Sequence, residues 1–412
     1  MMVLLAIVIL LAVATGEGVL YRLSYFLVLG AAGGYAWARV NLWRLDMWVE
    51  KQALVAQVGE MLEGFIYVRN NSPVPTGWVE IMQMSDMPGY VCGGATRLAA
   101  WESEAWNGQR FCYARGVYTI GPLVARSGDI LGLFRVQITR GDPVTVVVYP
   151  PTVELSYFRL PAADLSGEER VRHGSQTRSS HASSVREYNH GDSLNRIHWP
   201  STAKYDQLMS KEFDSGRSRD VWVVLDLERR IHRSRGMERT DEYAVAIAGS
   251  LARLALAEER SVGLIAYGDQ EYLLSLGSGT RQMSRVLEML AWSKTEGDNP
   301  LAEVLAQNTM KLDRFASLLI VTSSTTTEWV PVLQNLMYRG LSITVVLVEP
   351  TSFGGDRSCY EVVIRLLSAG IPAYVVRRGD ALPFALSRPM TLHDLPIFEQ
   401  RSTPELIPAS EA

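Results

Sequence analysis

Residues 221–377 alternate between short apolar segments and longer segments with a helical pattern. Strands that are apolar on both faces and alternate with helices are typical of a mainly parallel sheet covered by helices on both sides. We therefore predict strands at 221–227, 262–267, 318–323, 343–349 and 373–377, and helices at 241–259, 281–292, 328–338 and 360–368.

The charge and the motifs of the chain argue against several kinds of site. The net charge is −4 and no stripe of lysine and arginine is present, so we expect no nucleic-acid partner. Neither Gly-x-Gly-x-x-Gly nor Gly-x-x-x-x-Gly-Lys follows any expected strand, so we expect no nucleotide cofactor and no other cofactor. No catalytic motif stands out, and we assign no catalytic residue.

The N-terminus has the pattern of a membrane anchor. Residues 1–14 are an unbroken apolar run, 15–18 form a turn, and 19–38 are a second run that carries only Arg22. The second run has the length of a bilayer span, so we expect residues 1–40 to form a transmembrane helical hairpin in the cell membrane. Arg39, Arg44 and Lys51 follow it, and the positive-inside rule then places the soluble part in the cytoplasm.

Residues 41–150 have a β pattern. Short β-branched or aromatic runs at 64–70, 78–82, 116–120 and 144–149 are separated by turn residues, which predicts a small antiparallel sandwich or barrel. The three cysteines do not make a disulfide framework. Cys92 and Cys112 lie in this β region and can pair if it faces an oxidising compartment; well-separated cysteines are more often reduced.

Residues 151–220 join the two folded regions. A polar stretch at 151–184 precedes a charged segment at 185–214. In that segment we expect a strand at 185–188, a turn at 190–192, an irregular or briefly helical piece at 195–205 broken by Pro200, and a strand at 208–213. Its charges alternate in sign, so they can pair locally.

This segment, which we call the signature, resembles that of the bacterial domain-of-unknown-function family numbered 58. The resemblance is carried by Arg186-Glu187-Tyr188, Gly191-Asp192, Arg196-Ile197-His198-Trp199, Thr202-Ala203-Lys204 and Lys211-Glu212-Phe213. His190 and Lys204 replace the proline and arginine usual in the family. The resemblance implies a membrane-anchored protein with a von Willebrand factor A-like C-terminal domain. It also implies a protein partner, a MoxR-type AAA+ ATPase.

Domains of the von Willebrand factor A type often hold Mg²⁺ through an Asp-x-Ser-x-Ser run after the first strand. Here that run reads Asp226-Leu227-Glu228-Arg229-Arg230, so Glu228 and Arg230 stand at the serine positions. Arg230 would bring a cation to the place of the metal. We therefore expect no metal, and Asp226 and Glu228 are the only candidate ligands.

The fold we expect is an α+β multidomain chain: transmembrane hairpin 1–40, β-sandwich-like domain 41–150, polar loop and signature hairpin 151–220, doubly wound α/β domain 221–380 and tail 381–412. Three functions fit it. The first is a non-enzymatic adaptor that acts with the ATPase in assembly or maturation of envelope or other complexes. The second is a hydrolase that uses Glu187, Asp192 and His198, and the third is a structural envelope component that binds glycan or peptide. For the adaptor, the expected interaction residues are Arg186, Glu187, Tyr188, Gly191, Asp192, Arg196, Trp199 and Lys204.

Overall fold

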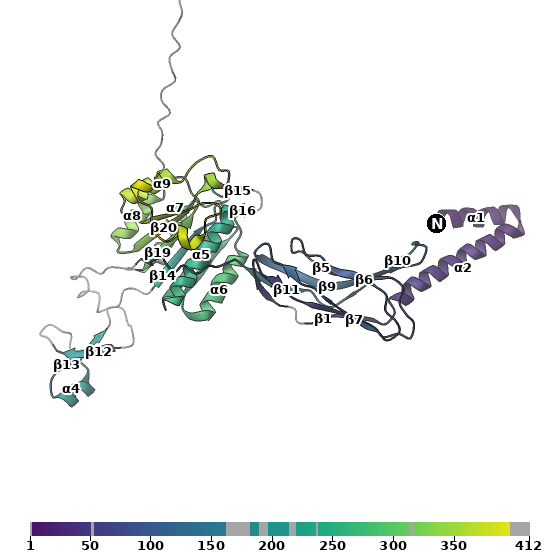
Figure 1. The fold of residues 1–412 in the computed structure, drawn as a ribbon, viewed down its shortest axis with the longest axis horizontal. Coiled ribbons are helices and arrows are strands. Elements are labelled where there is room, and N and C mark those ends of the chain that lie inside the picture. The colour runs from purple at the N-terminus through teal and green to yellow at the C-terminus, as the bar shows by residue number, and fades with distance from the viewer. Residues whose placement is uncertain are drawn as a thin grey trace, which may run out of the picture. The chain divides into compact units, whose positions relative to one another are not determined.

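The computed structural model describes residues 2–50, 53–161, 182–188, 197–213, 220–235, 238–313 and 316–395. The chain forms two compact units (Figure 1). Unit 1 contains Met1–Pro151 with Leu290–Trp292, and unit 2 contains Thr152–Met289 with Ser293–Ala412. The structure is therefore a mixed α and β chain with several sheets, as we expected.

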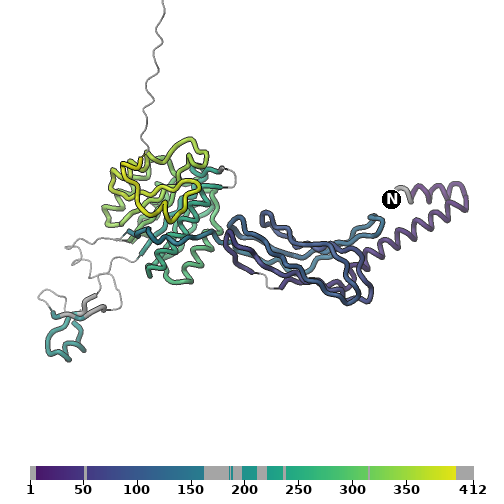
Figure 2. Tube along the Cα trace, in the orientation of Figure 1, coloured from purple at the N-terminus to yellow at the C-terminus, as the bar shows by residue number. Residues whose placement is uncertain are grey.

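Unit 1 begins with the two helices predicted at the N-terminus. These are α1 (Met2–Thr15) and α2 (Gly18–Asn41), which pack against each other after a tight turn (Figure 2). Within the part of the chain that the structure describes, no helix has both the length and the apolar character needed to cross a bilayer. The expectation of two transmembrane spans is therefore unconfirmed.

Two larger sheets and the two-stranded sheet β3-β8 make up the rest of unit 1. The first has the order β1-β4-β7 and the second the order β2-β11-β9-β5-β6, with β10 paired to β9. Buried residues of both sheets share one core, in which Leu45 and Ile66 meet Ile81 and Leu123, so the sheets pack face to face as a sandwich. The strands are β1 (Leu45–Glu50), β2 (Val55–Gln57), β3 (Met61–Leu62), β4 (Phe65–Asn70), β5 (Val79–Ser85), β6 (Cys92–Thr96), β7 (Ser103–Asn107), β8 (Arg110–Phe111), β9 (Gly116–Gly128), β10 (Arg135–Arg140) and β11 (Val144–Tyr149).

The strand pairing in the sandwich differs from the antiparallel arrangement that we predicted from the sequence. β2 pairs with β11 in parallel, so the sheets are not wholly antiparallel. Two parallel strands need a long connection. Here the connection consists of all the residues between β2 and β11. Cys92 and Cys112 are buried free cysteines that belong to separate apolar clusters.

The C-terminal end of α2 is fixed to the second sheet by Asn41. Its side chain is 1% exposed; the amide nitrogen donates to Ser127 Oγ at 3.0 Å, and the amide oxygen accepts from Gly77 N at 2.8 Å. Ser127 Oγ in turn donates to the carbonyl of Trp78 at 2.7 Å. A buried amide must have partners, so this network sets where α2 meets β5 and β9.

The signature forms a hairpin with a helix between its strands. β12 (Ala182–Glu187) pairs antiparallel with β13 (Met209–Phe213), and α4 (Trp199–Tyr205) lies between them in the chain. The expectation that Pro200 breaks this segment is wrong. Proline is tolerated in the first turn of a helix, where its missing N–H has no intrahelical partner, and Pro200 stands in that turn of α4.

The main sheet of unit 2 has the order β18-β17-β14-β19-β20-β21, and all neighbours are parallel except β17 and β18. Every strand and helix predicted in this unit is present. Strands β15, β16 and β18, helices α7 and α10, and the 3-10 helices η2 and η3 were not predicted. The elements are β14 (Asp220–Asp226), β15 (Ser234–Arg235), β16 (Glu238–Arg239), α5 (Thr240–Ala257), β17 (Ser261–Tyr267), β18 (Glu271–Gly277), α6 (Gly279–Trp292), α7 (Leu301–Asn308), β19 (Ser317–Thr322), α8 (Val330–Tyr338), β20 (Ser342–Val348), η2 (Pro350–Phe353), α9 (Tyr360–Ser368), β21 (Ala373–Val376), α10 (Leu382–Ala385) and η3 (Leu392–Asp394).

Helices cover both faces of this sheet. On one face Trp222, Ile320 and Val345 share a core with residues of α7, α8 and α9. The alternate residues of the same strands, such as Val223 and Val346, point to the other face, and α5 packs on β14, β17 and β19. Strands buried on both faces explain why the sequence reads as continuous apolar runs.

We predict that Asn41→Ala loosens the attachment of α2 to the sandwich. The change leaves the Gly77 N–H without its partner and removes the donor to the Ser127 hydroxyl, which keeps its bond to Trp78. We therefore expect the free energy of unfolding to fall by about 1–3 kcal/mol. Urea unfolding of the full chain, followed by tryptophan fluorescence, measures this. The control Arg39→Ala changes an exposed residue of the same helix and should cost less than about 0.5 kcal/mol. Equal losses in both variants would contradict this account of Asn41.

Candidate functional site

The carboxyl ends of β14 and β19 are the natural place for a site in unit 2. The chain passes from β14 to β17 on one side and later crosses to β19 on the other side. In parallel sheets, ligands bind outside the carboxyl ends of the strands where the connections change direction. Asp226 ends β14 and Thr322 ends β19, so the two residues stand at this point.

Asp226 is a buried carboxylate held by its neighbours. It is 4% exposed; Thr322 Oγ1 donates to Oδ2 at 2.6 Å, and the backbone N–H of Glu228 donates to Oδ1 at 3.2 Å. Burial raises the pKa of Asp226 to about 6, although both hydrogen bonds act in the opposite direction. His232 Nε2 lies 3.1 Å from the carbonyl oxygen of Asp226, to which it donates. The carboxyl therefore has local partners and titrates near neutrality.

The loop after β19, which follows Thr322, contains further hydroxyl side chains. Thr322 Oγ1 accepts from the N–H of Ser324 at 2.9 Å, and Ser324 Oγ lies 3.1 Å from Thr326 Oγ1. Ser323 is 1% exposed, and its hydroxyl has no hydrogen-bond partner among the residues that the structure describes. These contacts fix the loop after β19 against Asp226.

The Mg²⁺ site implied by the resemblance does not fit these residues. Burial raises the pKa of Glu228, and the positive charge of Arg230 nearby lowers it. A cation at that position competes with a metal, and the Thr322 hydroxyl is already used by Asp226. Among the described residues, no group of three or more histidine, cysteine, aspartate or glutamate side chains is arranged to hold a metal ion.

A second buried carboxylate, Glu349, was missed by the sequence analysis. It follows β20 directly and is 2% exposed. Oε1 accepts from Thr351 Oγ1 at 2.7 Å, and Oε2 accepts from Cys359 Sγ at 2.7 Å and from Ser358 Oγ at 3.1 Å. The sequence feature that could have identified Glu349 is an acidic residue immediately after an apolar strand.

Cys359 acts in this cluster as a buried donor. Burial and the neighbouring carboxylate of Glu349 both raise the pKa of the Cys359 thiol. A thiol with a raised pKa is a weak nucleophile because the thiolate is the reactive form. The Glu349 cluster is thus suited to holding the loop between β20 and α9 in place, and it does not provide a reactive group.

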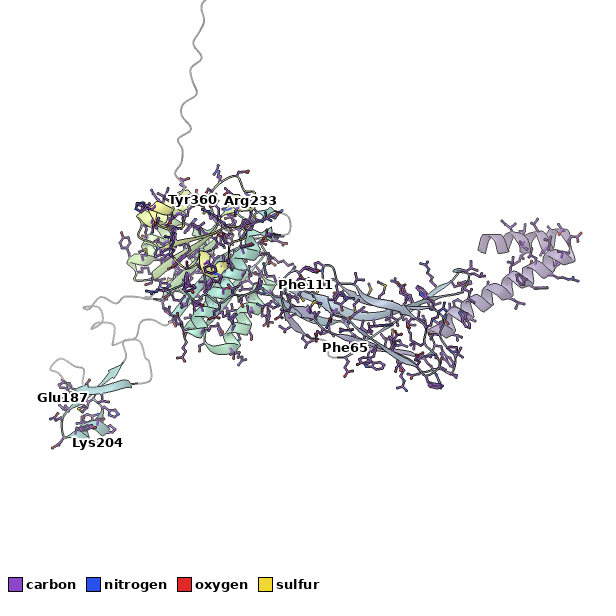
Figure 3. The ribbon with its side chains drawn as sticks, viewed as in Figure 1. Phe65, Phe111, Glu187, Lys204, Arg233 and Tyr360 are labelled. Atoms are coloured by element: carbon purple, nitrogen blue, oxygen red, sulfur yellow. The ribbon has the colours of Figure 1, made fainter. Side chains whose placement is uncertain are left out.

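The structure places part of the expected interaction set on the signature hairpin (Figure 3). Glu187 is exposed on β12, Lys204 is exposed on α4, and Trp199 is 65% exposed. Tyr188 is half-buried, and its N–H donates to the carbonyl of Leu208 at 2.8 Å. Arg186 lies opposite Ser210 in the strand register; Gly191, Asp192 and Arg196 lie outside the described residues.

His198, a member of the hydrolase hypothesis, caps α4. Its Nδ1 accepts from the N–H of Ser201 at 3.2 Å and lies 2.7 Å from Ser201 Oγ. Capping satisfies an N–H that has no partner within the helix. Asp192, its expected catalytic partner, lies outside the described residues, so His198 is placed here only in a structural role.

We predict that Asp226 makes the stability of the chain depend on pH. Its folded-state pKa of about 6 lies above its usual value of 3.8, so the folded state holds the proton more tightly than the unfolded state. Stability from this group is therefore lost as the pH rises from about 4 to about 7, by about 3 kcal/mol in total. The measurement is urea unfolding of wild type and Asp226→Asn across this range. The free energy of unfolding of wild type should fall relative to the variant; a difference independent of pH would refute the assignment.

Comparison with known proteins matches one segment of the chain to a family. Residues 184–353 match the family model described as "Protein of unknown function DUF58". "Uncharacterized protein YeaD" from Bacillus subtilis (strain 168) is 24% identical over 269 residues, which are 64% of this chain and 64% of that protein. The match thus spans slightly less than two thirds of that curated relative.

Solved structures give only partial matches. The CARDB domain of the PF1109 protein from Pyrococcus furiosus matches with a TM-score of 0.19 and 17% identity, over 25% of this chain and 93% of that chain. Proximal thread matrix protein 1 from the mussel byssus matches with a TM-score of 0.30 and 9% identity, over 41% of this chain and 45% of that chain. Residues 184–353 therefore match the DUF58 family of proteins of unknown function, and the match confirms the family predicted from the signature.

Proposed function

We propose that this chain is a membrane-anchored, non-enzymatic adaptor that binds a protein partner through its signature hairpin. The partner we propose, from the family resemblance, is a MoxR-type AAA+ ATPase, and the pair would act in assembly or maturation of envelope or other complexes. The observation that carries the proposal is the exposure of aromatic side chains on the hairpin. The other features of the chain are consistent with binding and offer little for catalysis.

The hairpin presents an unusual surface for a polar segment. Trp199 is 65% exposed, Tyr205 is 59% exposed and Leu208 is 46% exposed. The Lys204 ammonium lies 5.5 Å from the centre of the Tyr205 ring, which places a positive charge beside these apolar groups. Tryptophan and tyrosine are enriched among residues that dominate binding energy in protein interfaces. This surface falls inside the region that matches the family model.

We further propose that unit 2 is a von Willebrand factor A-like domain without a working metal site. Support comes from the parallel sheet, the position of Asp226 after its first strand, and the hydrogen bond from Thr322 to Asp226. The carboxylates at the strand ends are bonded to hydroxyl, thiol and backbone groups. Such a domain serves as a rigid binding platform, and this supports the non-enzymatic role.

The membrane anchor we propose is the α1–α2 pair. Leu10, Phe26 and Leu29 are each at least 70% exposed, and exposed apolar side chains continue along both helices. A helix that is apolar on most sides is normally buried in protein or in lipid. Arg39 and Arg44 follow the apolar part of α2. By the positive-inside rule, we propose that the chain after α2 lies in the cytoplasm, on the same side as the proposed ATPase partner.

We predict that Trp199→Ala strongly lowers recovery of the ATPase. The full-length chain carries a tag at its C-terminus, and proteins bound to it are purified from native membranes with and without ATP and Mg²⁺. Loss of one dominant aromatic contact costs about 2 kcal/mol or more, so recovery should fall by about 30-fold. Because Trp199 is exposed, the same change should alter stability by less than about 0.5 kcal/mol.

Phe384→Ala is the matched control, because Phe384 is an aromatic residue that is 73% exposed outside the signature. It should leave recovery of the ATPase unchanged. Recovery of envelope proteins or glycan-associated material alone would overturn the adaptor proposal and favour a structural component. Equal recovery with Trp199→Ala and wild type would remove the hairpin as the binding surface.

A further inference from the structure

A cavity of about 680 Å³ lies in unit 1 where α2 meets the second sheet. Trp37 of α2 and Trp78, just before β5, contribute aromatic side chains to its lining. Arg97, Arg126 and Arg135 contribute three guanidinium groups. None of the functions considered above uses this cavity.

The strand register places these side chains on one face of the sheet. Glu80 pairs with Arg126 and with Ala95, so Glu80 and Arg126 point the same way, and Arg97 lies two residues beyond Ala95. Arg135 pairs with Gly128, which is two residues beyond Arg126. Residues two apart on a strand share a face, so Arg126 and Arg135 point to the same side as Glu80. Arg97 follows the last residue of β6 and lines the same cavity.

Within the described residues, the positive charge of the cavity lining exceeds the negative charge. No carboxylate there forms an ion pair with any of the three arginines, and Arg126 Nη1 has only the neutral sulfur of Met82 at 4.0 Å. Glu80 and Asp129 also line the cavity, so two negative charges oppose three positive charges. Asp129 accepts from the N–H groups of Phe134 at 2.6 Å and Leu131 at 3.0 Å, which engages its carboxylate within its own loop. An anion therefore fits the cavity.

The position of the cavity indicates which anion it takes. Asn41 fixes the end of α2 to the sheet beside the cavity, and Trp37 lies one helical turn before Asn41. If the apolar part of α2 lies in lipid, the cavity stands at the level of the headgroups. Tryptophan is enriched at that level, and clustered basic residues attract anionic lipids there.

We propose that this cavity binds the headgroup of an anionic phospholipid, with Arg97, Arg126 and Arg135 holding the phosphate and Trp37 and Trp78 lying against the lipid. The proposal rests on the membrane anchoring proposed above. It adds a specific lipid contact that fixes the orientation of the sandwich on the bilayer surface. An arginine fork gives two parallel hydrogen bonds to a phosphate, which a lysine does not.

The test uses the full-length chain in a neutral detergent. Binding of dihexanoylphosphatidylglycerol, dihexanoylphosphatidylcholine and inorganic phosphate is measured by titration calorimetry. We expect saturable binding of the phosphatidylglycerol alone. One arginine near a lipid surface is worth about fivefold in affinity, so Arg126→Ala with Arg135→Ala should weaken binding by about 25-fold.

Arg69→Ala with Arg140→Ala is the matched control, because both arginines are exposed on strands of the same sandwich but do not line the cavity. It should leave the affinity within about twofold of wild type. Equal weakening by the two double variants, or no binding of phosphatidylglycerol, overturns the proposal. Binding of inorganic phosphate as tight as that of the lipid also overturns it, because the site would then recognise a soluble ion.

Flotation of the same preparations with pure phosphatidylcholine vesicles separates this inference from the anchoring on which it rests. A chain that floats but does not bind phosphatidylglycerol retains its anchor and lacks the headgroup site. A chain that does not float with any vesicle has no anchor, and both proposals then fail. Flotation together with lipid binding that depends on Arg126 and Arg135 supports both.

Discussion

Two buried carboxylates at the ends of parallel strands determine how unit 2 is built. A charge removed from water must be paired or hydrogen-bonded, or it must take up a proton. Asp226 is held by Thr322 and by the backbone of Glu228, while Glu349 is held by Thr351, Ser358 and Cys359. These bonds join each strand end to the loop beside it. The loops after β14, β19 and β20 are therefore fixed by the carboxylates they surround.

This arrangement also limits what the strand ends can do. Oxygens that already accept from hydroxyl, thiol and backbone donors have fewer lone pairs left for a metal. The surfaces that we propose for binding are the exposed aromatic surface of the signature hairpin and the arginine-lined cavity of unit 1. They are built from residues other than those at the strand ends.

The sequence predicted the buried strands of the main sheet of unit 2 well. It missed features that depend on the folded chain. Apolar runs located β14, β17, β19, β20 and β21, because strands buried on both faces need no polar alternation. Strand β18 was missed because only some of its residues are buried. Pro200 was read as a helix breaker, although its effect depends on its place in the first turn. The partners of Asp226 and Glu349 come from loops that only the folded chain brings together.

The central claim is that the signature hairpin contacts a protein partner. It is tested most directly by replacing Trp199 with a photo-crosslinking benzoylphenylalanine in the native cell, with the same replacement at Phe384 as the reference. Irradiation followed by mass spectrometry identifies what lies against each position. The account predicts a crosslink from position 199, and none from position 384, to an AAA+ ATPase of the MoxR type. Crosslinks from position 199 only to other residues of this same chain would contradict it, because the aromatic surface would then be an internal contact.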